Sequence, residues 1–342
     1  MIKEIRYNSL SNIFYRSLNN IACLIIGTVT SHSTLLSNEK TIVEIYGRIM
    51  GRRPNKDELL HWNASLNSGI SVAQIEKSLK ASFEYDQLRS RDDVVLVHLP
   101  SFKLYCRSSD LDVGAQIIGS QQFEPHIASV LKNSLKPGHI IVDLGANIGY
   151  FSLLAATLVG TTGKVISFEP NAHNLRLLFA SIVENGMKNI LVFPLAASLS
   201  PQILRLQSFG SNGFLEAPTS GQACAQYVQA IDIDQILLGT SRIDMFKMDI
   251  EGFEPFALRG MSKIIERHRP LIVTEFSPWH IEHRCGLPPK DYLIELSTKG
   301  YSLSIIEPSG NIMPASDPDT IMKFWRSLQN DKMHLDIVAR PD

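Results

Sequence analysis

An acid, a glycine turn and a second acid form the stretch of the sequence best suited to chemistry. A short apolar run at 140–142 leads into the pattern Asp-x-Gly-x-Asn-x-Gly, made by Asp143, Gly145, Asn147 and Gly149. A glycine in such a turn lets the backbone bend sharply and approach a ligand, because no Cβ intervenes. A second apolar run at 165–168 ends in Glu169, where an acid can hydrogen-bond the two hydroxyls of a ribose. The stretch therefore predicts a nucleotide-type binding turn.

The residue types in this turn favour S-adenosylmethionine over NAD. A dinucleotide fingerprint needs glycine where this chain has Asn147, so that the backbone can touch a pyrophosphate. Asp143 would repel a phosphate but suits a cationic amine, such as the amino group of a methionine moiety. The alternative is a purely structural turn between a strand and a helix.

A second group of acids follows two other apolar runs. Lys247 interrupts the run that precedes Asp249 and Glu251, and Glu275 closes the run at 271–273. Such an acid can act as general base on a hydroxyl, or bind a divalent ion such as Mg²⁺ that lowers the pKa of the hydroxyl. Lys247 would pair with an acid or orient the substrate. The alternative is a salt bridge at a strand end, with a carboxylate at a helix N-terminus.

Other polar residues near these runs have less distinctive settings. Glu275 is notable because a charge is rarely buried without a partner. His280 and His283 follow it in a segment that we expect to be a loop, where a histidine is usually solvated. Glu124 and His126 begin a predicted helix, and for them we expect a capping or solvated role rather than a catalytic one.

Alternating strand and helix patterns place these acids at the carboxyl ends of strands. The predicted strands are 139–144, 164–169, 190–195, 203–207, 226–231, 243–249, 270–276, 301–306 and 333–339. The predicted helices are 147–159, 171–185, 232–238, 254–267 and 288–299. This alternation predicts an α/β fold with a mostly parallel sheet covered on both faces, which binds ligands at the carboxyl ends of its strands.

The sequence also predicts how the chain divides into domains and which segments lie near the ligand. We expect weak order over 1–38, a small all-α module over 39–90, and a Rossmann-like domain over 91–342. Within that domain, strands at 94–99 and 102–106 and a helix at 123–135 would form part of a lid over the ligand. Residues 211–221, rich in Gly, Ser, Thr and Pro, predict a mobile loop beside the acceptor pocket.

Composition excludes several classes of function. The net charge of −1 offers no broad electrostatic attraction for nucleic acid. No segment reaches the roughly 18 apolar residues of a transmembrane helix, and the apolar patch Ile21–Thr30 resembles a lead-in segment more than a signal peptide. The cysteines, Cys23, Cys106, Cys224 and Cys285, lack metal-binding spacing. They predict reduced thiols in a reducing compartment, the cytoplasm.

The segments singled out above together resemble the FkbM-type methyltransferases over about residues 120–310. The resemblance is carried by Asp143-Leu-Gly-Ala-Asn-Ile-Gly-Tyr-Phe-Ser, Phe168-Glu-Pro-Asn, Lys247-Met-Asp-Ile-Glu-Gly-Phe-Glu254, Leu258-Arg-Gly260 and the segment from Pro270 to Glu275. It implies a class I methyltransferase fold, S-adenosylmethionine as methyl donor, and transfer to an oxygen of a sugar, polysaccharide or secondary metabolite.

The resemblance also implies roles for single residues. The glycine-turn residues would hold the methionine and ribose, and Glu169 the ribose hydroxyls, with Asn171 beside it. Lys247, Asp249, Glu251 and Glu275 would lie on the reaction side. The family's Ala-x-x-Asp stretch near the adenine is here Ala196-Ala-Ser-Leu-Ser-Pro201 without the acid, so Ser198 or backbone groups would take that contact.

Residues 39–90 resemble a different family, the domain-of-unknown-function 4214 family of short helical repeats. The resemblance is carried by residues such as Tyr46, Pro54, Trp62, Gly69 and Tyr85. It implies an accessory module that docks a protein partner, in a pathway linked to surface glycans. A plain three-helix packing module is the alternative.

Two other functions make different predictions. An NAD-dependent enzyme that modifies nucleotide sugars predicts glycine at position 147 and a Tyr-x-x-x-Lys pair, and neither is present. A non-catalytic protein with a degenerate methyltransferase fold predicts loss of the acids, yet Asp143, Glu169, Asp249, Glu251 and Glu275 are all there.

Overall fold

The computed structural model describes residues 32–50, 53–82, 84–85, 93–218, 226–315, 317–330 and 333–342, without the side chains of 32–37, 48 and 209. The lead-in patch Ile21–Thr30 and the thiols Cys23 and Cys224 lie outside these residues. Contacts divide the chain into two compact units, Met1–Arg89 and Ser90–Asp342. Among the described residues no helix combines the length and apolar character needed to cross a membrane.

The first unit contains α2 (His32–Ile49), α3 (Lys56–Asn67) and α4 (Val72–Lys80). Asn55 with Glu58 and Ser71 with Gln74 form capping boxes at the starts of α3 and α4. The helices bury a small apolar core that includes Ile42, Ile45, Tyr46, Ile75 and Leu79. α2 begins at His32, inside the segment for which we expected weak order.

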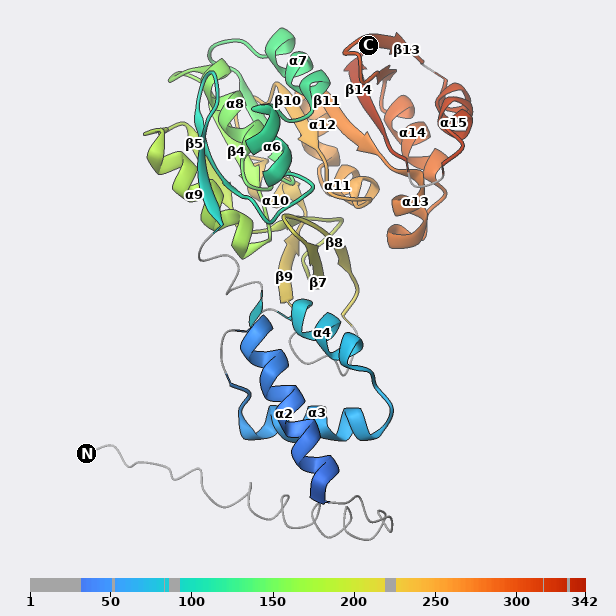
Figure 1. Ribbon diagram of the computed structural model, residues 1–342. Coiled ribbons are helices and arrows are strands. Elements are labelled where there is room, and N and C mark those ends of the chain that lie inside the picture. Colours follow the sequence, from blue (N-terminus) through green and yellow to red (C-terminus); the bar gives the residue numbers. More distant parts are fainter. Residues whose placement is uncertain are drawn as a thin grey trace, which may run out of the picture. The chain divides into compact units, whose positions relative to one another are not determined.

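The second unit is built on an eight-stranded sheet of order β13-β12-β14-β11-β10-β3-β4-β5 (Figure 1). Its strands are β3 (Ile140–Leu144), β4 (Lys164–Phe168), β5 (Ile190–Phe193), β10 (Met245–Met248), β11 (Leu271–Phe276), β12 (Tyr301–Ile306), β13 (Ile312–Pro314) and β14 (Leu335–Pro341). The five strands from β11 to β5 run parallel, and β14 is antiparallel to both β11 and β12. The predicted α/β fold with a mostly parallel sheet is thus confirmed.

Helices cover both faces of this sheet. The covering helices are α7 (Pro125–Ser134), α8 (Tyr150–Val159), α9 (Ala172–Glu184), α10 (Ile233–Leu237), α11 (Glu254–Gly260), α12 (Ser262–His268), α14 (Pro289–Thr298) and α15 (Pro318–Ser327). Alternate residues of one strand enter two different cores because side chains of a strand point to opposite faces. Ile141 packs with residues of α7, α8 and α9, whereas Val142 packs with residues of α10, α11, α12 and α14.

Smaller elements surround the sheet. β1 (Val94–His98) and β2 (Lys103–Arg107) form the predicted hairpin, and α6 (Gly114–Ser120) follows it. α13 (Pro278–His280) and a π-helix at Ile281–Cys285 replace the loop expected around His280 and His283. The predicted helix at 254–267 is two helices, because the chain leaves helical geometry at Met261 between α11 and α12.

The predicted mobile loop at 211–221 is wrong over its first half. β7 (Gln202–Phe209) and β8 (Asn212–Glu216) form an antiparallel hairpin whose turn is Gly210-Ser211. Together with β6 (Ala196–Ala197) and β9 (Gln226–Ile231) they make a second sheet of order β6-β9-β7-β8. Leu206 pairs with Leu215, and both are buried. These apolar side chains of the hairpin therefore pack inward. Residues 219–221 lie outside the description.

Candidate functional site

The glycine turn between β3 and α8 is held against the end of β10. Gly145 has φ +81°, and a Cβ on it would lie 1.9 Å from the carbonyl oxygen of Asp249, so only glycine fits this approach. The amides of Gly145 and Ala146 both donate to the carbonyl of Phe168 at 3.0 Å. Gly149, with φ +101°, begins α8, and a Cβ there would meet Leu178 at 2.4 Å. These close contacts fix the turn.

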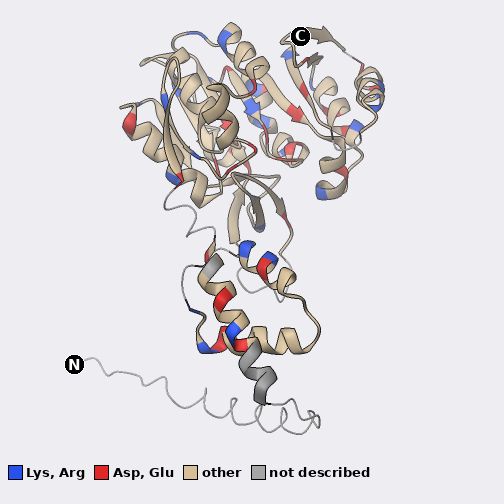
Figure 2. Cartoon of the chain, in the orientation of Figure 1, with Lys and Arg blue, Asp and Glu red and all other residues tan. Residues whose placement is uncertain are grey.

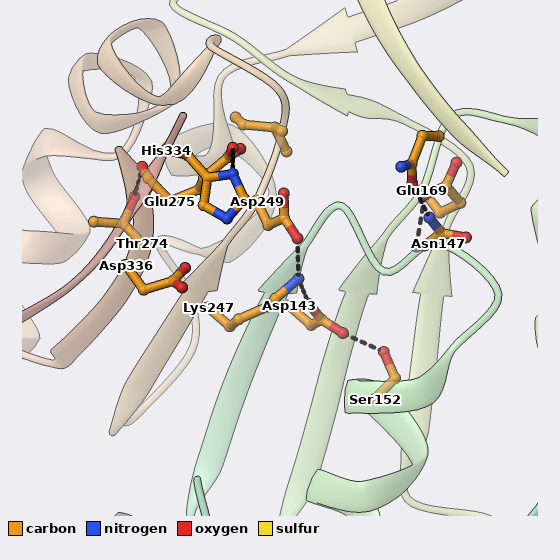
Figure 3. Close-up of polar contacts among 12 residues, drawn as sticks. Asp143, Asn147, Ser152, Glu169, Lys247, Asp249, Thr274, Glu275, His334 and Asp336 are labelled. Atoms are coloured by element: carbon orange, nitrogen blue, oxygen red, sulfur yellow. Dashed lines mark hydrogen bonds and ion pairs between the residues drawn. The ribbon is translucent and has the colours of Figure 1, made fainter. Parts of the chain in front are cut away.

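Glu169, immediately after β4, holds the two turns on either side of it. Its carboxylate accepts 2.8 Å hydrogen bonds from the backbone N–H groups of Asn147 and Asn171. Burial raises the pKa of Glu169 to about 7, although these two bonds partly offset the rise. Asn171 in turn caps α9 through the amide of His173. Figure 3 shows the Glu169 carboxylate lying beside Asn147.

A pocket, here called the Glu169 cavity, opens above these turns. Its apolar wall comes from both sheets and consists of Phe168, Leu195, Ala196, Ala197, Leu206, Ile250 and Leu215. Its polar groups are Asn147, Glu169, Asn171, Ser211, Asn212, Asp249 and Glu251. The hydroxyl of Ser211 is buried without a hydrogen-bond partner among the described residues, which indicates an unmet contact for a ligand.

A second pocket, here called the Glu124 cavity, adjoins the first. Its aromatic wall is formed by Phe123, Tyr150 and Phe151. Its ionisable side chains are Glu124, Lys247, Asp249, Glu251, Glu275, His280, His334 and Asp336. The two cavities share Gly145, Asn147, Asn212, Asp249 and Glu251. A ligand in one cavity would therefore meet a ligand in the other beside Asp249.

Lys247 joins two carboxylates beneath this meeting point. Its Nζ lies 3.1 Å from Asp249 Oδ2 and 3.9 Å from Asp143 Oδ1, and Asp143 also accepts a 2.6 Å bond from Ser152 Oγ (Figure 3). Burial alone would lower the pKa of Lys247, but the charges of Asp249 and Asp143 raise it. Burial alone would raise the pKa of Asp249, but Lys247 brings it below the ordinary value. Lys247 and Asp249 are therefore both charged at neutral pH.

The structure does not bring all the predicted residues to the cavities. Asp143 is 1% exposed and lines neither cavity, because its carboxylate faces Lys247 and Ser152. The cationic partner expected for it is thus a residue of the chain itself. Ser198 is also buried away from the cavities, and its hydroxyl accepts a hydrogen bond from Gln202. Ala196 and Ala197 line the wall where Ser198 was expected.

Glu251 and Glu275 do face the Glu124 cavity. Glu251 has φ +57° and accepts a 3.3 Å bond from Arg284. Burial and the charge of Asp249 raise its pKa, which Arg284 partly offsets. Glu275 lies 3.5 Å from His334 through Oε1, and its Oε2 is buried without a partner among the described residues (Figure 3). Burial and the charge of Asp249 raise the pKa of Glu275 well above its ordinary value.

Four residues in or beside the Glu124 cavity were not predicted from the sequence to be site residues. Glu124 and His126 belong to the start of α7, and His334 and Asp336 to the start of β14. His126 Nε2 lies 2.8 Å from Asp336 Oδ2, and this contact raises the pKa of His126. This pair joins segments far apart in the chain. The only local signal in the sequence is the acid Glu124 directly before Pro125, and that pattern also fits an ordinary helix start.

The donor set does not fit the divalent ion that we considered. Within the described ranges, no three His, Cys, Asp or Glu side chains are arranged to hold a metal. The carboxylates that come closest are instead compensated by Lys247 and Arg284. Charges of both signs are also interspersed over the described elements (Figure 2). We therefore derive no step through a metal ion.

Three carboxyls with raised pKa values make the stability of the fold pH-dependent. Burial raises the pKa of Glu169 to about 7 and that of Glu254 to about 8, and burial together with Asp249 raises that of Glu124 to about 7. The folded chain keeps protons that the unfolded chain has lost, so stability falls as the pH rises through these values. Urea unfolding should give a free energy lower by roughly 1–4 kcal/mol at about pH 8.5 than at about pH 6.5. An equal or higher value at about pH 8.5 would contradict this.

Comparison with known proteins gives one family match. The sequence profile described as Methyltransferase FkbM domain matches residues 143–323, which is more than half of the chain. The match begins at Asp143 and does not extend to the helical module at 39–90 or to Glu124, His334 and Asp336. No curated protein matches the chain.

Several solved structures match parts of the chain. An FkbM methyltransferase from Methylobacillus flagellatus KT is 17% identical, with a TM-score of 0.38, and the match covers 87% of this chain but 58% of that one. A SAM-dependent methyltransferase from Aquifex aeolicus is 14% identical over 68% of this chain and 95% of its own, with a TM-score of 0.36. A Streptococcus mutans structure, described as a candidate methyltransferase in complex with SAH, is 11% identical over 64% and 98%, with a TM-score of 0.35.

Proposed function

Because the chain belongs to the methyltransferase FkbM domain family, we propose that it transfers a methyl group from S-adenosylmethionine to a hydroxyl oxygen of an acceptor. The observation that carries the proposal is the meeting of two cavities at Asp249. One cavity is apolar with a carboxylate at its floor, and the other is rich in acids and aromatic rings. Methyl transfer needs two such compartments, because donor and acceptor must approach each other in line.

The Glu169 cavity fits the adenosine part of the donor. Its apolar wall, including Phe168, Ala197 and Leu206, suits an adenine ring, and the Glu169 carboxylate suits the ribose hydroxyls. The hydroxyl of Ser211, which has no partner among the described residues, supplies a further polar contact. S-adenosylmethionine, when bound, would supply a methyl group on a positively charged sulfur, and the acids shared by the two cavities favour that charge.

The glycine turn supports this donor over NAD. A dinucleotide site presents free backbone N–H groups to a pyrophosphate. In this chain the amides of Gly145 and Ala146 donate to Phe168, and the amide of Asn147 donates to Glu169. These groups are engaged within the protein, and the nearby carboxylates would repel a pyrophosphate.

The Glu124 cavity supports an uncharged, hydroxylated acceptor such as a sugar. Carboxylates accept hydrogen bonds from hydroxyl groups, and the rings of Phe123, Tyr150 and Phe151 offer apolar surface to the faces of a sugar ring. Glu124, Asp249 and Glu275 would disfavour phosphate or carboxylate groups on the acceptor. A hydroxylated secondary metabolite satisfies the same chemistry.

The protein residues would align the two reactants and hold charge. Asp249 is at the boundary of both cavities, with 33% of its side chain exposed, so its free oxygen can accept a hydrogen bond from the acceptor. Lys247 fixes the other oxygen of that carboxylate. The shared boundary of the two cavities would bring the acceptor oxygen toward the methyl carbon, and such alignment is a main source of rate in displacements of this kind.

The change Glu169→Gln tests the donor site. The neutral amide can no longer accept hydrogen bonds with both of its polar atoms, so contacts to the ribose and to the two turns weaken. We expect the dissociation constant for S-adenosylhomocysteine to rise by about 10–100-fold in isothermal titration. The exposed Glu266→Gln should leave it unchanged, whereas equal affinity in both variants would remove Glu169 from the donor site.

A methyl-transfer assay tests the function itself. Purified protein would be incubated with methyl-labelled S-adenosylmethionine and a panel of methyl glycosides, and ether products would be identified by mass spectrometry. Label should appear on a hydroxyl oxygen of an uncharged glycoside, and phosphorylated sugars should react poorly. Binding of NADH but not of S-adenosylhomocysteine would refute the proposal.

The helical module at 39–90 enters the proposal as an accessory, partner-docking part of a surface-glycan pathway, by its resemblance to a short helical repeat. Its internal packing supports a stable unit: Trp62 Nε1 donates a 2.9 Å hydrogen bond to Tyr46 Oη over the buried Ile42 and Ile75. Removal of residues 1–89 is expected to leave donor binding intact, since the cavities described above are formed by the second unit.

A further inference from the structure

Glu124 has an unusual backbone for its residue type. It precedes Pro125 at the start of α7 and has φ +37° and ψ +68°, a left-handed conformation that is uncommon for a residue with a Cβ. Strain of this kind persists only where surrounding structure imposes it, and it is concentrated at functional sites. Glu124 lines the cavity named after it. We therefore looked for a function that would account for this backbone conformation.

The carboxylate of Glu124 differs from its neighbours because it has no partner of its own. Asp249 is paired with Lys247, Glu251 with Arg284, and Asp336 with His126. Glu275 has His334 at 3.5 Å. The described part of the chain offers the Glu124 carboxylate no hydrogen bond or ion pair. Among the acids that line the cavity, Glu124 is therefore the one whose carboxylate has neither oxygen engaged by the described residues.

We propose that Glu124 is the general base that takes the proton from the acceptor hydroxyl. The proposal rests on the proposed methyl transfer and assigns the proton step to a residue outside the family match at 143–323. It assigns to Asp249 the separate role of positioning the acceptor, because Asp249 is already committed to Lys247.

The charges around Glu124 suit this role. Burial and the charge of Asp249 raise the pKa of Glu124 to about 7, Asp336 raises it further, and Lys247 and His126 partly offset the rise. Glu251, Glu275, His280 and His334 line the same cavity. A base is most effective when its pKa is near the working pH. Asp249, with its lowered pKa, is a much weaker base.

Proton removal and methyl transfer together conserve atoms and charge. The O–H bond of the acceptor breaks, and its proton passes to the Glu124 carboxylate. The acceptor oxygen forms a bond to the methyl carbon, while the carbon–sulfur bond breaks and leaves its electron pair on sulfur. The products are a methyl ether, the neutral thioether and a protonated Glu124, which returns the proton to solvent.

The test compares Glu124→Gln with Glu266→Gln, an exposed glutamate on α12. Glycerol and methyl α-D-mannopyranoside would serve as acceptors with methyl-labelled S-adenosylmethionine. Glu124→Gln should lower kcat by about 10²–10⁴-fold while S-adenosylhomocysteine binds within about threefold of wild type. The acid limb of the wild-type pH profile, near pH 7, should disappear in Glu124→Gln, and Glu124→Asp should restore part of the rate.

A second readout needs no acceptor. In protein carrying ¹³C-labelled glutamate and saturated with S-adenosylhomocysteine, the carboxyl signal missing from Glu124→Gln identifies Glu124. Its titration should have a midpoint near 7, and an ordinary glutamate value would overturn the proposal. If neither probe is methylated, this titration decides alone.

The outcomes separate the two proposals. If Glu124→Gln transfers methyl groups at a rate near wild type with the same acid limb, the base assignment is wrong and the methyl transfer stands. If wild-type protein binds no S-adenosylhomocysteine, the proposed function itself fails.

Discussion

Replacing Lys247 by methionine is expected to lower the free energy of unfolding by about 3–5 kcal/mol, the cost of leaving a buried ion pair without one partner. Lys247 is 5% exposed and lies between the carboxylates of Asp143 and Asp249. Methionine is similar in size but carries no charge, so both acids would lose their compensating cation. Urea unfolding monitored by circular dichroism measures the effect.

The matched control is Lys290→Met. Lys290 also forms a short ion pair, 2.7 Å from Asp319, but the two side chains are 40% and 57% exposed. Surface pairs of this kind contribute about 0–1 kcal/mol. The double change Lys247→Met with Asp143→Asn should recover part of the loss, because it removes one of the unpaired charges. Equal losses of unfolding free energy in Lys247→Met and Lys290→Met would show that the buried ion pairs of Lys247 do not stabilise the fold more than a surface pair does.

The change Asp249→Asn should lower turnover by about 10²-fold while S-adenosylhomocysteine binds nearly as well as to wild type. Asp249 is at the boundary of the two cavities, and an amide in its place would hold Lys247 and the acceptor less firmly. A misplacement of about 1 Å between reacting atoms costs on the order of 10²-fold in rate. Steady-state kinetics with a methylated glycoside as product measures the loss.

The pH profile distinguishes this variant from the Glu124 variant. If Asp249 positions the acceptor, Asp249→Asn keeps an acid limb, whereas Glu124→Gln loses it. The exposed Asp291→Asn on α14 serves as a control and should behave as wild type. Turnover at the wild-type rate in Asp249→Asn would remove Asp249 from the mechanism.

The sequence predicted the parts of the site that depend on local pattern. The turn around Gly145 and the acid at Glu169 lie where the alternation of strand and helix placed them. Their spacing is short, and glycine at a left-handed position has a local physical cause. The strands that carry Asp249 and Glu275 were predicted for the same reason, because buried parallel strands appear as continuous apolar runs.

The partner of Asp143 could not be read from local pattern. Asp143 and Ile141 point to the same face of β3, and Ile141 packs in the core beneath α8. In the parallel register, Lys247 is paired with Asp143 across β3 and β10. That register depends on contacts between strands about a hundred residues apart, so the sequence left the acid open to a ligand role.

The residues of the Glu124 cavity that escaped prediction are also products of long-range folding. His126 meets Asp336 across a separation of 210 residues, and β14 lies between β11 and β12. Glu124 before Pro125 fits an ordinary helix start, and its left-handed backbone is set by the surrounding structure. The hairpin at 202–216 was mistaken for a mobile loop because its Gly and Ser residues mark the turn, whereas Leu206 and Leu215 mark the pairing.

A crystal structure of the protein with S-adenosylhomocysteine would show how the donor product is held. We expect the ribose hydroxyls within hydrogen-bond distance of the Glu169 carboxylate and the adenine against Phe168 and Leu206. The sulfur should point into the cavity that Glu124 and Asp249 line, with space beyond it for the acceptor. A ligand seated elsewhere, or with its sulfur turned away from Asp249, would show that these cavities are not the methyl-transfer site.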